Sequence, residues 1–382
     1  MKKTLLAAAL LAGFAGVAQA ETSVTLYGII DTGLGYNKIS GGTDAQNGSR
    51  FGMINGVQNG SRWGLRGSED LGDGLRAVFQ LESGFDSGNG KSAQGGRLFG
   101  RQATVGLASD SWGQLDFGRQ TNIASKYFGS IDPFGAGFGQ ANIGVGLSST
   151  NTVRYDNMVM YQTPSFSGFQ FGVGYSFSAD EANVPATGAT NPDRVGFRTA
   201  DNVRAITTGL RYVNGPLNVA LSYDQLNASN RQSQAEIDAT PRSYVIGGSY
   251  DFEVVKLALA YGRTTDGWFG GQSIATGGAS GSSSLGFGGN IFRDGFRSNS
   301  YLLGLSAPIG GASSLFGSWQ RVDPSNDRLT GDDATMNVYS LGYTYDLSKR
   351  TNLYAYGSYA KNFAFLDDIK STAVGVGIRH RF

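Results

Sequence analysis

Apolar and polar residues alternate with a period of two over most of this chain. In the stretch GFQFGVGYSFS, the odd-numbered residues from Phe169 to Phe177 are apolar, and the residues between them are Gln, Gly and Ser. The stretches PLNVALSYDQ and NVYSLGYTYDL repeat this pattern. Successive side chains of a strand point to opposite sides, so the alternation predicts β-strands with one apolar face. No segment shows a comparably long period of 3.6 residues, and we therefore expect an all-β fold.

The connections between the predicted strands alternate between short and long. EDLGDG and SDSWG are short turns, whereas residues 37–59 and 121–151 are long and largely polar. A soluble sandwich has no reason to place every long connection at one end, whereas outer-membrane barrels combine short periplasmic turns with long external loops. The predicted strands are sixteen, an even number, near 22–36, 60–69, 74–85, 98–109, 112–120, 152–162, 168–178, 203–213, 216–226, 242–251, 254–264, 298–307, 312–322, 335–347, 351–361 and 371–382.

Strands of this length suit a membrane. A tilted strand of about 9–11 residues crosses the hydrocarbon layer, and closure into a barrel leaves no backbone group unpaired in lipid. Gly and Ser on the face opposite the apolar one leave room for solvent inside. In SRWGLRGS, Trp63 and Leu65 would then face lipid, while Arg62 and Arg66 would face water. The pattern predicts a sixteen-stranded antiparallel transmembrane barrel with a wet lumen.

The N-terminus predicts export. MKK precedes the uncharged run TLLAAALLAGFAGV, and Ala18-Gln19-Ala20 forms a cleavage pattern. We therefore expect residues 1–20 to be a cleaved signal peptide and residues 21–382 to form a single outer-membrane barrel domain. Without Lys2 and Lys3, 29 of the 31 basic side chains remain against 30 acidic ones, and this balance favours no nucleic-acid partner.

The residue types for catalysis and metal binding are scarce. The chain has no cysteine, so it has neither disulfides nor a thiolate metal site. His380 is the only histidine and has no surrounding nucleophile motif. Gly90-Lys91-Ser92 lacks the earlier glycine of a phosphate-binding loop, since Phe85 stands in its place. We expect no enzyme, no cofactor and no metal site.

Several motifs resemble general porins of Gram-negative outer membranes, closest to the beta-proteobacterial and neisserial branch. They extend over nearly the whole mature chain: SVTLYGIIDTGLGY, SRWGLRGSEDLGDGLRAVFQLE, GRQATVGLASDSWGQLDFGRQ, VRYDNMVMYQTPSFSGFQFGVGYS and GVGIRHRF. The resemblance implies a homotrimer of sixteen-stranded barrels among outer-membrane lipid and lipopolysaccharide. It also implies that the terminal Phe382 is a signal read by the barrel-assembly machinery, although a terminal aromatic is equally typical of an interfacial girdle.

The family's third external loop folds into the barrel and narrows it, and the resemblance places that loop at residues 121–151. Asp132-Pro133-Phe134-Gly135 occupies the position of the constriction carboxylates, and Asp132 is the only acidic residue of the loop. The family's wall cluster of arginines maps onto Arg62, Arg119 and Arg154. Ile29 stands where some relatives carry a lysine. We expect Phe134 and Phe138 to pack the loop against the barrel wall.

Three further side chains share the inward direction or adjoin the arginines. Arg66 and Arg76 are possible pore-lining residues or solvated surface charges, and Glu82 is expected to pair with a wall arginine in a structural or a functional role.

Several arginines facing one carboxylate predict a passive, weakly anion-selective pore for small hydrophilic solutes, because rings of charge bias ion permeation. Arg62→Ala or Arg154→Ala should lower the anion preference, and Asp132→Asn should raise it. Two alternatives stay open. One is a substrate-specific channel for phosphate or organic acids, and the other is a surface adhesin or receptor that uses the external loops.

Overall fold

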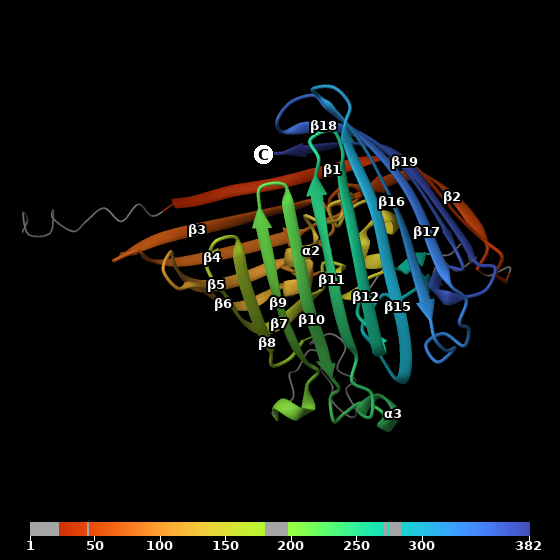
Figure 1. The fold of residues 1–382 in the computed structure, drawn as a ribbon, viewed down its shortest axis with the longest axis horizontal. Helices are drawn as coiled ribbons and strands as arrows, with labels where there is room; N and C mark the ends of the chain where they lie inside the picture. Colours follow the sequence, from red (N-terminus) through yellow and green to blue (C-terminus); the bar gives the residue numbers. More distant parts are fainter. Residues whose placement is uncertain (1–22, 44–45, 180–197, 271–272, 276–283) are drawn as a thin grey trace, which may run out of the picture.

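The structure is a closed, antiparallel β-barrel (Figure 1). The computed structural model describes residues 23–43, 46–179, 198–270, 273–275 and 284–382, so the expected signal peptide lies outside the described residues. The first and last strands pair along Ile29–Ser40, which closes the barrel. Among the described residues, no helix is long and apolar enough to cross a bilayer. The predicted all-β fold is confirmed.

The strands of the barrel follow the predicted ones to within a few residues at most ends. They are β1 (Ser23–Ser40), β2 (Gly48–Asn55), β3 (Arg62–Gly72), β4 (Leu75–Gly84), β5 (Gln102–Ser109), β6 (Gly113–Thr121), β7 (Arg154–Gln162), β8 (Phe169–Ser176), β9 (Arg204–Asn214), β10 (Leu217–Asn227), β11 (Arg242–Asp251), β12 (Lys256–Trp268), β15 (Ile291–Pro308), β16 (Ser313–Pro324), β17 (Met336–Asp346), β18 (Thr351–Lys361) and β19 (Lys370–Arg381). A small separate hairpin is formed by β13 (Ser273–Ala275) and β14 (Ser284–Gly286).

Two of these strands share one position in the wall, which makes the barrel sixteen-stranded. The first part of β1 pairs with β3, and its second part, Thr32–Ile39, pairs with β2. The prediction of a loop over 37–59 was therefore wrong for β2. Its alternation is too short to be recognised alone, with only Phe51 and Met53 as large outward residues, and β1 supplies the partner that makes it a strand.

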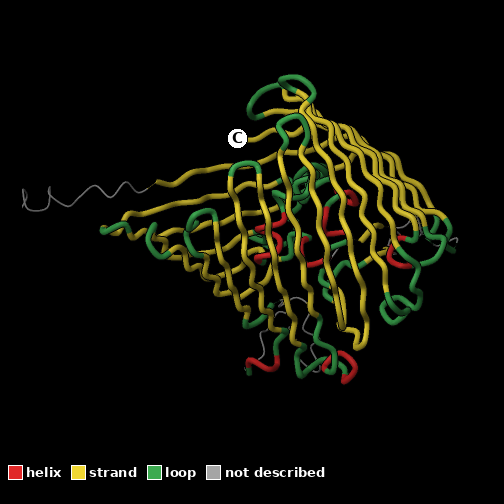
Figure 2. Tube along the Cα trace, in the orientation of Figure 1, coloured by secondary structure: helices red, strands yellow, loops and turns green. Residues whose placement is uncertain are grey.

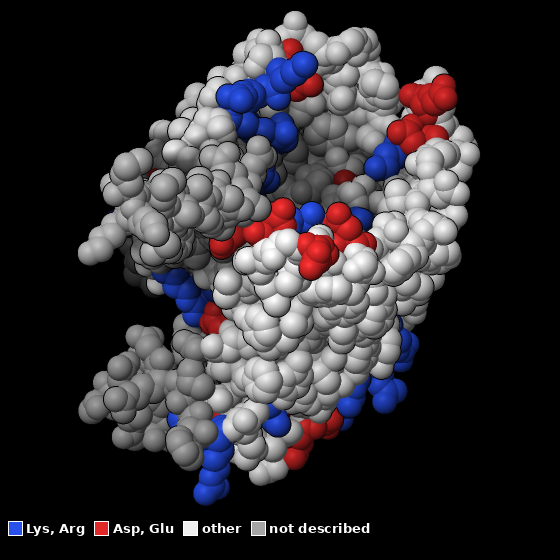
Figure 3. Space-filling model, turned by 90° about the vertical axis from the view of Figure 1, so that its left-hand side faces the viewer, with Lys and Arg blue, Asp and Glu red and all other residues white. Residues whose placement is uncertain are grey.

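The two ends and the outer surface of the barrel differ in the way the alternation predicts. Short turns gather along the upper left edge in Figure 1, and the longer connections, including α3 (Gln234–Ile237), lie at the opposite end. Large apolar side chains are exposed on the outside, as a lipid-facing wall requires; they include Val105, Phe117, Phe171, Leu221, Leu259, Leu303 and Leu341. Figure 3 shows a broad uncharged band on this wall, with charged residues around the hollow at one end.

The connection between β6 and β7 folds into the barrel (Figure 2). It contains α2 (Ile123–Phe128) and three short 3₁₀ turns, η1 (Gly139–Ala141), η2 (Ile143–Val145) and η3 (Ser148–Thr150). The Asn122 side chain caps α2 by accepting a hydrogen bond from the backbone N–H of Ser125, and its Nδ2 donates to Asp224 on β10 at 2.8 Å. The described part of this connection, residues 122–153, is called the inner loop below.

Glycines on the inner wall make room for the inner loop. A Cβ atom added to Gly304 would lie 2.3 Å from Cγ of Pro133, and one added to Gly172 would lie 2.5 Å from Cδ1 of Ile123. Both separations are far below van der Waals contact, so only glycine allows the loop to approach this closely. The abundance of glycine on the polar face therefore seats the loop as well as leaving space for water.

Aromatic packing fixes the tip of the inner loop on the far wall. The ring centroid of Phe134 lies 5.0 Å from that of Phe316 on β16, and the ring of Phe138 lies 5.5 Å from that of Tyr354 on β18. The backbone N–H of Phe138 also donates to the carbonyl of Val57, between β2 and β3. The expected packing of Phe134 and Phe138 against the wall is confirmed.

Candidate functional site: an arginine-lined constriction

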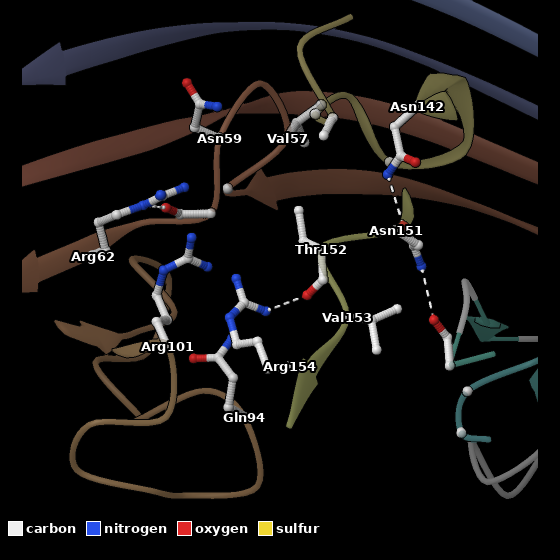
Figure 4. A pocket seen from close by; sticks show the side chains of 18 of the residues that line it. Val57, Asn59, Arg62, Gln94, Arg101, Asn142, Asn151, Thr152, Val153 and Arg154 are labelled. Atoms are coloured by element: carbon white, nitrogen blue, oxygen red, sulfur yellow. Dashed lines mark hydrogen bonds between the residues drawn. The ribbon is translucent and has the colours of Figure 1, made fainter. Parts of the chain in front are cut away.

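A cavity of about 440 Å³ lies between the inner loop and one side of the barrel wall. Its basic side is formed by Arg62 from β3, Arg101 from the segment before β5, Arg119 from β6 and Arg154 from β7. Figure 4 shows Arg62, Arg101 and Arg154 pointing toward one another. The remaining lining is small or amide-bearing and includes Val57, Asn59, Gln94, Ala136, Gly137, Asn142 and Asn151. The cavity is thus polar and open to charged solutes.

Backbone carbonyls hold two of these guanidinium groups in place. Nε of Arg62 donates to the carbonyl of Gly60 at 2.9 Å, and Nη1 of Arg154 donates to the carbonyl of Thr152 at 3.1 Å. Thr152 has φ = 51°, a left-handed conformation that is uncommon for a β-branched residue. Arg154 lies two residues after Thr152, at the first position of β7, so the bend orients the side chain toward the cavity.

Arg119 points inward because of a β-bulge. The register between β6 and β7 shifts between Gly118 and Gln120, and Gly118 has φ = 121°. Phe117, two residues earlier, faces outward, so strict alternation would have placed Arg119 in lipid as well. Nε of Arg119 donates to the carbonyl of Gly100 at 2.8 Å. The bulge therefore turns a lipid-facing position into a pore-facing one.

Two carboxylates lie within the arginine wall itself. Glu82 accepts a hydrogen bond from Nε of Arg101 at 2.7 Å, and its Oε1 is 3.9 Å from Nη1 of Arg62. Asp156 pairs with both Arg119 and Arg97, and its distance to Arg97 is 3.0 Å. Glu82 thus pairs with wall arginines, as expected from the sequence.

The cluster has an excess of positive charge. Among the described residues, the four arginines that line the cavity (Arg62, Arg101, Arg119 and Arg154) face two carboxylates of the wall, Glu82 and Asp156, which leaves two formal positive charges. Among the described residues, no carboxylate oxygen lies within 4.0 Å of the Arg154 guanidinium, so its charge is directed at the cavity without an ion-pair partner. Low-dielectric walls around a narrow passage concentrate such a field.

The structure places Asp132 elsewhere than the sequence analysis expected. Its side chain is buried, and its two carboxylate oxygens accept hydrogen bonds from the backbone N–H groups of Phe134, Ala136 and Ile143 at 2.9–3.0 Å. Burial raises the pKa of the Asp132 carboxyl to about 6, and the three N–H donors oppose that rise. Asp132 does not line the cavity, so it does not face the arginines across it.

The rest of the Asp132–Gly135 segment also serves the loop rather than the cavity. Pro133 packs at Gly304, Phe134 packs against Phe316, and Gly135 takes a left-handed conformation with φ = 59°. A carboxylate that binds three N–H groups is a folding element, because it satisfies backbone donors that the tight turns leave unpaired. The negative charge near the arginines comes instead from Glu82 and Asp156.

Three further predicted residues lie away from the cavity. Arg66 lies over the ring of Tyr27, 5.4 Å from its centroid, in a separate recess of the wall. Arg76 forms an exposed ion pair with Asp110 at 2.8 Å, at the end of the barrel that carries the short turns. Phe382 exchanges two backbone hydrogen bonds of 3.1 Å with Gly28, which extends the closing strand pair.

Sequence reasoning missed Arg101. In a strand over 98–109, alternation places Arg101 on the same face as the exposed Val105 and Leu107. The strand begins only at Gln102, so the alternation does not apply to Arg101, and the residue turns inward to Glu82. The only sequence signal for it is an arginine just before a strand that enters the barrel.

A closed transmembrane barrel with a loop folded inside and a polar, charged passage defines a channel-forming protein of the outer membrane. A model described as Gram-negative porin matches residues 7–363, and the chain belongs to this family. An outer membrane porin protein of Bordetella pertussis is 78% identical over 393 residues, covering 100% of both chains. Outer membrane porin protein 32 of Delftia acidovorans is 34% identical over 407 residues, again covering 100% of both chains.

A solved structure agrees with this assignment. The anion-selective porin from Comamonas acidovorans has a TM-score of 0.69 and 30% sequence identity, with 95% of this chain and 100% of that chain covered. The protein is therefore a β-barrel porin of the Gram-negative outer membrane, and proteins of this family and fold are channels rather than enzymes.

Proposed function

We propose that this porin is a passive diffusion pore for small hydrophilic solutes and ions, with a weak preference for anions. The observation that carries the proposal is the excess of arginine over carboxylate around the 440 Å³ cavity, with Arg154 unpaired among the described residues. The similar anion-selective porin from Comamonas acidovorans supports the sign of this preference.

The size of the preference follows from Coulomb's law. A unit charge about 4 Å from an ion contributes about 1 kcal/mol in bulk water and about 4 kcal/mol at an effective dielectric constant of 20. A wet passage with protein walls lies nearer the first value, and salt screens it further. One unpaired arginine is thus worth about a fivefold change in the local concentration of an anion, since 1.4 kcal/mol corresponds to a factor of ten. This favours anions without excluding cations.

Zero-current potentials across planar bilayers in a potassium chloride gradient test the proposal. The wild-type protein should show a potential of the sign set by chloride permeation. Arg154→Ala should move that potential toward zero, because it removes an unpaired charge at the cavity. Arg76→Ala is the matched control, since its guanidinium lies at the rim in an exposed pair with Asp110 and should leave the potential unchanged. A wild-type potential of the sign set by potassium would overturn the anion preference.

We also propose that the protein works as a homotrimer in lipid and lipopolysaccharide, and that the barrel-assembly machinery reads Phe382 during biogenesis. The exposed apolar outer wall and the membership in the porin family support this proposal. Native mass spectrometry of the detergent-extracted protein tests the oligomer: a mass of three chains is expected, and a mass of one chain would contradict it.

A further inference from the structure

The inner wall contains a second recess, of about 320 Å³, between the arginine cluster and the short turns. Arg66 lines it from β3, four residues beyond Arg62 and therefore about 13 Å nearer the short turns at 3.3 Å per residue. The remaining lining comes from β1, β4, β5, β6 and β7 and from α2 of the inner loop. A solute that passes the arginines reaches this recess next.

Side-chain amides dominate the recess. Five glutamines from four neighbouring strands line it, namely Gln80, Gln102, Gln114, Gln120 and Gln162, together with the hydroxyls of Ser23, Thr25, Ser68 and Thr104. An amide both donates and accepts hydrogen bonds, as does a hydroxyl. Such a lining matches a solute that carries hydroxyl groups, because each of those groups also needs both a donor and an acceptor.

One of these amides has a nitrogen without a hydrogen-bond partner among the described residues. Gln120 is 1% exposed, and its Nε2 has no hydrogen-bond partner among the described residues. Buried donors are nearly always satisfied, and one that is not calls for an explanation. The last torsion of a glutamine side chain is soft, so Nε2 can turn toward a bound acceptor. Gln114, in contrast, is already committed, since its Nε2 donates to both carboxylate oxygens of Asp116 at 2.9 and 2.8 Å.

Of the three charged side chains that line the recess, the Lys126 ammonium is the one that can bind a solute. Lys126 projects into the recess from α2, and its Nζ forms no hydrogen bond or ion pair with the described residues, whereas Asp116 is bound by Gln114 and Arg66 lies over Tyr27. Burial lowers the pKa of Lys126, and the charge of Asp116 opposes that effect. A bound carboxylate would favour the charged ammonium and partly replace its lost hydration.

We propose that this recess is a binding subsite for a small carboxylate that carries hydroxyl groups. Its carboxylate would lie between the Lys126 ammonium and the Gln120 amide, and its hydroxyls would contact the other glutamines and the wall hydroxyls. The recess suits phosphate less well, because phosphate favours several guanidinium groups and the single Arg66 here is stacked on Tyr27. This inference rests on the proposed pore function and adds a solute class to it.

Blockage of the single-channel current by gluconate tests the subsite, with acetate as the comparator that lacks hydroxyls. Gluconate added on the short-turn side should give blocked intervals at least several times longer than those of acetate. Lys126→Met should shorten the gluconate blocks about tenfold, and Lys349→Met, which changes an exposed lysine in a short turn, should leave them unchanged. If Lys126→Met does not insert, Gln120→Leu carries the test and should shorten the blocks several-fold.

Blocks of equal length for gluconate and acetate, or blocks unaffected by both substitutions, would overturn the subsite. The zero-current potential measured in the same bilayers separates this result from failure of the pore proposal. A cation preference combined with Lys126-dependent gluconate blocks would reject the anion selectivity and support the subsite. An anion preference without such blocks would do the reverse.

Discussion

Gln320 holds the inner loop from the opposite wall, and its removal should loosen the constriction. The side chain lies on β16 and is fully buried. Its Oε1 accepts a hydrogen bond from the backbone N–H of Gly146 at 3.0 Å, and its Nε2 donates to the carbonyls of Ala141 at 3.2 Å and Asn142 at 2.9 Å. One amide thus makes three hydrogen bonds to the loop backbone, and Gln320→Ala removes all three. The Gly146 N–H and the Asn142 carbonyl keep their hydrogen bonds within the loop, whereas among the described residues the Ala141 carbonyl loses its partner.

The magnitude follows from these three bonds. A typical hydrogen bond contributes about 1 kcal/mol net, so Gln320→Ala should destabilise the seated loop by about 3 kcal/mol. Because 1.4 kcal/mol corresponds to a factor of ten, the population with residues 139–147 displaced should rise about a hundredfold. Displacement of these residues changes the cavity directly, since Gly139 and Asn142 line it.

Single-channel recording at constant voltage measures this change as the frequency of brief closures and substates. Gln320→Ala should raise that frequency by about two orders of magnitude with little change in the main conductance. Gln170→Ala is the control, because in the described part of the chain Gln170 bonds to Thr163 and Arg211 and to no residue of the inner loop. Equal closure frequencies in the wild-type protein and Gln320→Ala would refute the role given to this anchor.

Three further predictions concern the loop seat, the loop carboxylate and the chain end. Gly304→Val should lower the single-channel conductance, because its Cβ requires Pro133 to move by at least about 1 Å toward the passage, whereas Gly311→Val, with no atom within 4 Å, should not. Asp132→Asn should increase current noise and leave the zero-current potential nearly unchanged, since the buried carboxylate binds backbone N–H groups and does not itself line the cavity; a large change of potential would contradict this placement. Phe382→Ala should reduce the amount of barrel in the outer membrane of expressing cells while the same variant refolds normally in detergent; unchanged membrane levels would remove its role in assembly.

The alternation of residues predicted the barrel well because lipid imposes it. Every outward position between the rims must be apolar, so strands such as β11 and β18 were located to the residue. The pattern weakens where strands extend beyond the membrane. The predicted strand 298–307 became β15, which begins at Ile291, and β12 ends at Trp268 rather than near 264. There the backbone pairing continues although the side chains no longer alternate.

The site was predictable only in part, because its geometry depends on local irregularities. Arg62 follows the simple alternation of β3. Arg119, in contrast, faces the pore only because of the bulge at Gly118, so the resemblance to porins identified this arginine and the alternation did not. The inward direction of Arg101 and the pairing of Asp156 with Arg97 depend on the path of the connection between β4 and β5. The burial of Asp132 could not be read from its position in the loop, because its three N–H partners are created by the fold of that loop.

Charge placed chemically at position 154 tests the central claim most directly. The chain contains no cysteine, so Arg154→Cys provides a single reactive thiol at the cavity. In the bilayer, a positively charged methanethiosulfonate should restore the anion-favouring zero-current potential that the substitution diminishes, and a negatively charged one should move the potential toward cations. A potential that stays the same after both reagents, despite confirmed labelling, would contradict the conclusion that arginine charge at this constriction sets the ion preference.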